Sequence, residues 1–415
     1  MVRLKKIIFK LLMSGALLSM SMSALALDAV AYYSDNNSDL VYVIDPRNMS
    51  IVSKIPTEGN QPYPIDKVGN NKVYVTTRNS ESLDIIDYDG AHFFNAGIIP
   101  LEHKPRSVTY NPASRLAAVS GTKNALTTII NPEDDSVVAL AGNPNILAPS
   151  DFGGSLATGH AFWVDEDQFL ILDRARRLVK LYKVKQLRNG KWKIKYQDSI
   201  KTPTSIHHFE NVPKASNYFQ RRTFYGMAEG APNEGKFPSV LRIFVTGNRI
   251  YKTGNAKMVS EDVTKSGSHH LGMHPDKRHV YAGSNEGNVF VIDRFSMKTI
   301  NIVEAGALAG HTTFNESSGI AVQTNHRDSF MTLIDMKTHT FIKNVSVARS
   351  FSPIGSLAQS HTTSFDPKKS GVFYTAASDD GNYVEVDAES GVVTRTLPLD
   401  ADGYIIQGTY NWNLQ

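Results

Sequence analysis

A short phrase recurs along the chain at intervals of about 42 to 62 residues. It is a run of β-branched and aromatic residues that ends in an acidic residue and is followed by a turn. A repeat of this period is typical of an array of identical supersecondary units rather than of unrelated domains. The clear copies are Val41–Asp45, Leu83–Asp87, Val289–Asp293, Met331–Asp335 and Tyr383–Asp387, with weaker copies at Leu126–Asn131, Leu178–Lys183 and Leu241–Thr246.

Each interval is long enough for four short antiparallel strands, and four-stranded units repeated around an axis are the blades of a β-propeller. The sequence therefore predicts an all-β propeller of eight blades. Residues 29–55 supply three strands of the first blade, and the tail 404–410 is expected to add the missing innermost strand. That pairing closes the ring and removes its open edges. Seven blades stay open as an alternative, because the unit 200–262 is irregular and contains the insertion 211–222. A β-sandwich or two smaller β domains would require the regular spacing to be accidental.

The phrase Val73–Thr77 followed by Leu83–Asp87 resembles the YVTN-type repeat of secreted bacterial and archaeal propellers. The resemblance extends over residues 28–415. It implies a propeller fold, but such a fold hosts many functions, so function has to be argued from a site.

Histidines fall at one position of the repeat, the start of the innermost strand, in five consecutive units. An innermost strand lines the central channel, so these side chains are expected to converge there. They are the candidate metal ligands: His160, His207, His208, His269, His270, His311 and His361.

Several imidazoles around one axis suit Zn²⁺ and also Cu, Ni or Fe. Clustered imidazolium ions would repel one another, which favours the neutral, metal-binding form. Because side chains alternate along a strand, we expect one of His207 and His208, and one of His269 and His270, to face the axis. The alternative is a structural role between blades. Against it, two other units carry Gln61-Pro62 and Lys104-Pro105-Arg106 at this position.

The other aspartates and histidines are expected to have structural or surface roles. The aspartates that end the repeats are expected to shape turns. His274 and His279 are expected to serve at the surface or behind other ligands, and His92, His103, His326 and His339 to be exposed. Because no Walker loop, GxSxG elbow or HExxH motif is present, binding is favoured over catalysis.

The first 26 residues have the pattern of a secretion signal. A basic start precedes an apolar run from Ile7 to Leu18, and Ala24-Leu25-Ala26 forms a cleavage site. We therefore expect an exported, periplasmic protein with one propeller domain over residues 27–415 and no membrane span.

The net charge of the domain is zero. Residues 1–26 carry Arg3, Lys5, Lys6 and Lys10, so the remaining chain has as many basic as acidic residues, 40 each. A balanced charge argues against nucleic-acid binding. The absence of cysteine excludes disulfides, Fe–S clusters and thiolate zinc sites.

An exported propeller with clustered histidines is similar to the periplasmic zinc chaperones of the AztD type. That resemblance implies zinc, or copper, as cargo and the solute-binding protein of a metal ABC transporter as partner. A weaker similarity is to the propeller domain of nitrous oxide reductase, whose copper site is held by histidines alone. This chain lacks the cysteine-bearing copper domain found there. Two further hypotheses remain open: a ligand- or protein-binding scaffold without metal, and a copper or iron redox enzyme.

Overall fold

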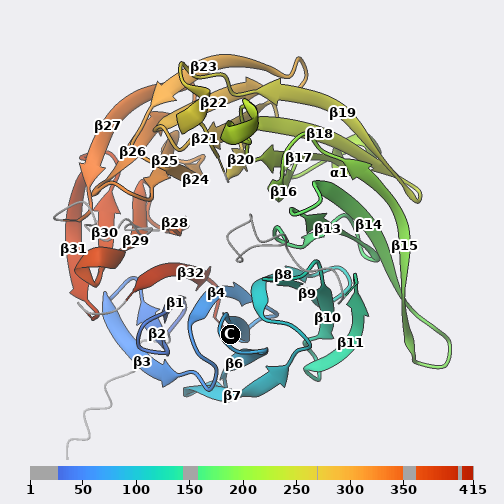
Figure 1. Ribbon diagram of the computed structural model, residues 1–415. Helices are drawn as coiled ribbons and strands as arrows, with labels where there is room; N and C mark the ends of the chain where they lie inside the picture. The colour runs from blue at the N-terminus through green and yellow to red at the C-terminus, as the bar shows by residue number, and fades with distance from the viewer. Residues whose placement is uncertain (1–26, 144–157, 269, 349–360, 401–403, 415) are drawn as a thin grey trace, which may run out of the picture.

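The structure is a computed structural model that describes residues 27–143, 158–268, 270–348, 361–400 and 404–414. Eight four-stranded antiparallel sheets are arranged as blades around a central axis (Figure 1). The prediction of an eight-bladed propeller is confirmed. The fifth blade is complete, because the insertion forms helix α1 (Tyr218–Arg221) between two of its strands. Seven blades are thereby excluded.

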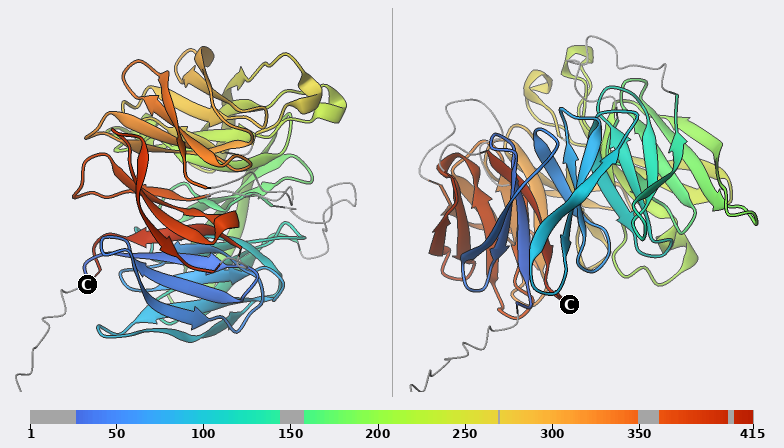
Figure 2. Two further views of the ribbon diagram at one scale, coloured as in Figure 1. Left: turned by 90° about the vertical axis from the view of Figure 1, so that its left-hand side faces the viewer. Right: turned by 90° about the horizontal axis from the view of Figure 1, so that it is seen from below.

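The first blade joins the two ends of the chain. Its innermost strand is β32 (Ile405–Asn411), which pairs with β1 (Val30–Asp35), followed outward by β2 (Leu40–Asp45) and β3 (Ser50–Pro56). Figure 2 shows β32, in dark red, beside the blue strands. The predicted closure of the ring by the C-terminal strand is confirmed.

The other blades each use four consecutive strands, with the first strand innermost. Blades two to four are β4 (Pro62–Lys67), β5 (Val73–Thr77), β6 (Ser82–Tyr88) and β7 (Phe93–Pro100); β8 (Pro105–Asn111), β9 (Leu116–Gly121), β10 (Thr127–Asn131) and β11 (Ser136–Ala141); and β12 (Phe162–Trp163), β13 (Gln168–Asp173), β14 (Leu178–Gln186) and β15 (Trp192–Lys201).

Blades five to eight follow the same order around the ring. They are β16 (Ile206–Asn211), β17 (Thr223–Ala228), β18 (Ser239–Thr246) and β19 (Arg249–Lys257); β20 (Leu271–Met273), β21 (His279–Gly283), β22 (Asn288–Asp293) and β23 (Lys298–Glu304); β24 (Ala309–Asn315), β25 (Ile320–Asn325), β26 (Phe330–Asp335) and β27 (Thr340–Ser346); and β28 (Thr363–Phe365), β29 (Val372–Ala377), β30 (Asn382–Asp387) and β31 (Val392–Pro398). Single-turn 3₁₀ helices are η2 (Pro232–Glu234), η3 (Val263–Lys265) and η4 (Ser378–Asp380).

The hydrophobic core lies between neighbouring blades. Middle strands such as β5 are buried along their whole length, whereas the outermost strand β31 alternates half-buried and exposed residues. One apolar cluster joins Leu170 and Leu181 of blade four to Phe224 and Leu241 of blade five. Each fully buried side chain of this kind contributes roughly 1.5–3 kcal/mol. The apolar clusters therefore fix each blade against the next and so set the geometry of the central channel.

The aspartates that end the repeats shape turns. Asp45 accepts hydrogen bonds from the backbone N–H groups of Arg47 and Asn48, and Asp293 and Asp335 make the same pair of bonds to the residues two and three positions onward. A carboxylate that holds the following backbone in this way is typical of an Asx turn. Among the helices of the described ranges, none is long and apolar enough to cross a membrane.

Candidate metal centre

The innermost strands bring histidines from blades four to eight to the channel. His207 and His208 lie in β16 and His311 in β24, while His160, His270 and His361 come just before β12, β20 and β28. His269, the other candidate from blade six, lies outside the described residues. The short inner strands therefore place the six described candidates around one space, although they are up to 201 positions apart in the chain.

Irregular pairing at the start of the inner strands shapes this placement. The β16–β17 pairing shifts between Ile206 and Phe209, and the β24–β25 pairing shifts between Ala309 and Thr312. Both shifts occur where the histidines lie. An irregularity of this kind bends a strand and turns side chains away from strict alternation. This explains how two successive residues, His207 and His208, both reach the cluster.

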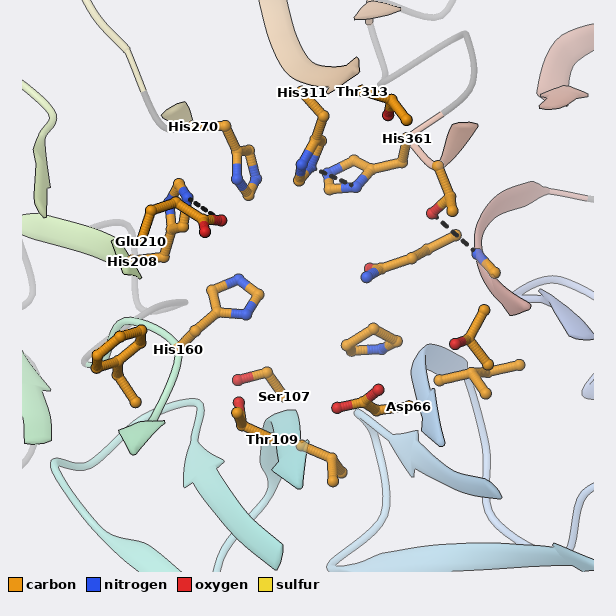
Figure 3. Close-up of a pocket in the computed structure, with 18 of the residues that line it drawn as sticks. Asp66, Ser107, Thr109, His160, His208, Glu210, His270, His311, Thr313 and His361 are labelled. Carbon is orange, nitrogen blue, oxygen red and sulfur yellow. Dashed lines mark hydrogen bonds and ion pairs between the residues drawn. The ribbon is translucent and has the colours of Figure 1, made fainter. Parts of the chain in front are cut away.

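Three of the histidines form its tightest part (Figure 3). The rings of His270 and His311 have centroids 3.4 Å apart, and those of His311 and His361 are 4.5 Å apart. His311 Nε2 and His361 Nδ1 share a hydrogen bond of 3.0 Å. One ring nitrogen of each of the three lies within 4.8 Å of the other two. Tetrahedral coordination at about 2.0–2.1 Å requires donor atoms about 3.3 Å apart, so small ring movements suffice to surround one ion.

His208 and His160 extend this group across the channel. The ring of His208 lies 4.6 Å from that of His270, and His160 lies 6.1 Å from His270. His208 Nε2 is 3.2 Å from the carbonyl oxygen of Leu271 and 3.7 Å from a carboxylate oxygen of Glu210. With Nε2–H donating to that carbonyl, Nδ1 is the nitrogen of His208 that carries a lone pair and would bind a metal ion.

The paired histidine of β16 has different surroundings. His207 is buried, its Nδ1 lies 3.1 Å from Glu229 Oε1, and the guanidinium of Arg106 lies 3.4 Å from its ring. His208 lines the channel cavity of about 460 Å³, whereas His207 lines a second cavity at one end of the channel. Its ring still lies 4.8 Å from that of His270. His208 thus faces the channel cavity and His207 faces the second cavity, on two sides of one histidine cluster.

Burial keeps at least one of the imidazoles neutral. The pKa of His160 lies well below its usual range, first because the ring is buried, and then because Arg106, His208 and the more distant Arg78 and Arg174 oppose a further positive charge. A neutral imidazole retains the lone pair that a metal ion requires.

Two carboxyl groups line the same cavity as the histidines, Glu210 beside His208 and Asp66 on another inner strand. Burial raises the pKa of Asp66 to about 7, although the backbone N–H groups of Lys67 and Tyr110 act against it. Burial also raises the pKa of Glu210 to about 7. Both belong to inner strands and appear in Figure 3 with the histidines. The channel cavity thus contains both nitrogen donors and carboxyl groups that ionise near neutral pH.

His326 belongs to the histidine cluster, although the sequence did not predict it there. His326, expected to be exposed, is fully buried, and its ring stacks on His361 at 4.6 Å with an interplanar angle of 17°. It follows β25, whose end pairs with the start of β24, so it lies beside His311. A β-carbon on Gly310 would overlap the His326 ring, which accounts for glycine there. The antiparallel pairing of the two strands was the available signal.

Three other histidines, His92, His103 and His339, were also expected to be exposed. His103 is buried, with Nε2 2.8 Å from the hydroxyl of Thr128, and His339 is half-buried, so both of these expectations were wrong. His92 is exposed as expected. His103 and His339 follow strands, like His326, and the packing of adjacent blades covers them.

A second group of ligand-type side chains lies between blades six and seven, in the turn from β20 to β21. Asp276 Oδ2 is 2.5 Å from His279 Nδ1, and the Nδ1 of buried His274 accepts the backbone N–H of Asp276 at 3.1 Å. One ligand atom of each lies within 4.8 Å of the others. We call these three residues the turn cluster. Asp276 also accepts the N–H groups of Arg278 and His279, so turn geometry explains much of this arrangement.

Comparisons with known proteins support the fold. No known protein family and no curated protein matches the chain by sequence. Among solved structures, dihydro-heme d1 dehydrogenase NirN in complex with DHE aligns with a TM-score of 0.64 at 13% identity, covering 92% of this chain and 75% of NirN. AztD from Citrobacter koseri aligns with a TM-score of 0.62 at 13% identity, covering 92% of this chain and 98% of AztD. Both are β-propellers. At such identities the similarity establishes the fold alone.

Proposed function

We propose that this chain is an exported propeller that binds a transition-metal ion, zinc or copper, in the central channel and serves as a metal chaperone or sequestering protein. The primary ligands are His270, His311 and His361, and His208 and His160 are further donors. The observation that carries the proposal is the convergence of three imidazole nitrogens within 4.8 Å of one another. Nitrogen-only donor sets suit zinc and copper and disfavour magnesium and calcium, which bind oxygen.

The number of imidazoles around the tight group supports exchange of a bound ion. A carrier needs ligands that hold an ion and release it to a partner, whereas an enzyme needs an open coordination position beside a catalytic base. Here additional imidazoles surround the tight group, so an ion can pass from one set of donors to the next. The hydrogen bond between His311 and His361 implies one further step. The ring that donates its proton has to shift it to its other nitrogen before both rings can coordinate.

The cellular setting follows from the N-terminal sequence. Residues 1–26 have the pattern of a cleaved signal peptide, which would place the domain 27–415 in the periplasm. The similarity to zinc chaperones of the AztD type favours the solute-binding protein of a metal ABC transporter as recipient.

Elemental analysis of untagged protein isolated from the periplasm tests this proposal. We expect about one equivalent of zinc or copper in the native protein and none in a variant with His270→Gln, His311→Gln and His361→Gln. His92→Gln is the matched control, because it makes the same change at an exposed site. His279→Gln tests the turn cluster. Equal metal content in the native protein and the triple variant, or loss of metal in His279→Gln alone, would contradict the assignment.

A further inference from the structure

A second cavity, of about 440 Å³, lies at one end of the channel on the far side of the histidine cluster. His160 and His361 line both cavities, so the two adjoin. Its polar wall is rich in guanidinium groups. Besides Tyr63, His160 and His361, the ionisable side chains that line it are Arg78, Arg106, Arg174, His207 and Glu229. We call it the mouth cavity.

The charges in the mouth cavity do not balance. Glu229 is engaged by Arg174, whose Nε lies 3.0 Å from Glu229 Oε2. Arg106 is 3% exposed and donates to the carbonyl oxygen of Thr158, and Arg78 lies over the ring of Tyr63 at 4.0 Å. Within the described ranges, neither Arg78 nor Arg106 has a carboxylate at ion-pairing distance.

The donors of these two side chains are also incompletely used. The Nε atoms of Arg78 and Arg106 are buried and have no hydrogen-bond partner in the part of the chain that the structure describes. Burial and the neighbouring guanidinium groups lower the pKa of Arg106 well below its usual range, which reflects the unfavourable surroundings of its charge. A buried charge without a counter-ion is strongly destabilising, so its retention calls for an anion.

The remaining walls indicate what kind of anion fits. Tyr63, Pro64, Pro232 and Leu308 add apolar surface to the lining of the cavity. A volume of about 440 Å³ is within the range of small-molecule sites. Planar guanidinium groups pair with carboxylates through two parallel hydrogen bonds, and an apolar wall favours an organic body over a fully hydrated inorganic ion.

We propose that the mouth cavity binds a small organic carboxylate, with Arg78 and Arg106 pairing its carboxylate group and Tyr63, Pro232 and Leu308 covering its apolar part. The proposal does not depend on metal binding. Because His160 and His361 line both cavities, a ligand with a second donor group is able to extend toward the histidine cluster. The propeller would then bind an organic anion beside its metal ion.

Calorimetric titration of the metal-free protein tests this inference, with benzoate, succinate and inorganic phosphate as probes. We expect saturable binding of at least one carboxylate and about tenfold or more weaker binding in Arg78→Gln and in Arg106→Gln, the loss typical of a charged hydrogen bond. Arg115→Gln is the control, because Arg115 is an exposed residue that pairs with Glu133. If Arg106→Gln fails to fold, Arg78→Gln, at a half-buried position, carries the test.

Two kinds of result would overturn the proposal. Saturable binding of phosphate without either carboxylate would overturn the assignment of an organic ligand. No saturable binding of any probe, or equal affinity in the native protein and both arginine variants, would overturn the site itself. Since all titrations use metal-free protein, these results are independent of whether the histidine cluster holds a metal ion.

Discussion

The half-buried carboxyl group of Asp66 should make the stability of the protein depend on pH near neutrality. Asp66 lies on the innermost strand β4 and lines the channel cavity. Burial raises its pKa from 3.8 to about 7, so between these values the folded state holds a proton that the unfolded state has released. A raised pKa means that the stabilisation is complete below pH 4 and is lost as pH rises through 7.

The size of the effect follows from the shift. About two of the roughly three pH units of this shift lie above pH 5, and they correspond to roughly 2.7 kcal/mol at 1.36 kcal/mol per unit. This is an upper bound, because Asp66 is half-buried and faces a channel open to water, so we expect about 1–2 kcal/mol. Asp66→Asn has no proton to lose. Relative to the native protein, the variant should therefore gain about 1–2 kcal/mol of unfolding free energy between pH 5 and pH 8.

Urea titrations of both proteins at pH 5, 6, 7 and 8 measure this difference. Asp89→Asn is the control. The pKa of Asp89 is lowered by hydrogen bonds from the backbone N–H groups of His92 and Ala91, so Asp89 stays ionised in the folded protein from pH 5 to pH 8. The control should shift stability by a constant amount over this range. A free-energy difference between Asp66→Asn and the native protein that stays constant from pH 5 to pH 8 would refute the reasoning.

Three further predictions concern the ring and the cluster. Gly310→Ala should destabilise the protein by about 2 kcal/mol or more in urea titrations, because the added carbon overlaps the buried ring of His326. Deletion of residues 404–415 removes β32 and leaves β1 as an open edge, so size-exclusion chromatography should show aggregates that the full chain does not form. Zinc affinity in competition titrations should fall as pH drops below about 6.5, because protons then compete with the metal ion for the imidazole nitrogens.

The repeat made most of the architecture predictable from the sequence. Val41–Asp45 and its copies each form the third strand of a blade counted from the axis, and the tail pairs with β1 as expected. These features follow from local patterns, because burial on both faces requires a continuous apolar strand and an acidic residue supports the turn that follows. The alignment of the innermost strands likewise brought His160, His311 and His361 to one place.

Other parts of the site depend on packing that no local pattern records. His326 was missed because only the pairing of β24 with β25 places it beside His311. Arg78, Arg174 and Glu229 follow second strands of three different blades, where a charged residue resembles an ordinary turn residue. They meet Arg106 only when the ring closes. The irregular start of β16 likewise broke the alternation that was expected to separate His207 from His208.

The geometry of the bound metal is the most direct test of the central claim. X-ray absorption and anomalous diffraction from zinc-loaded protein should locate one ion among His270, His311 and His361, with nitrogen ligands at about 2.0–2.1 Å. A zinc ion at the turn cluster instead, with an oxygen ligand from Asp276, or protein that retains no zinc after loading, would contradict the account of the channel as a metal site.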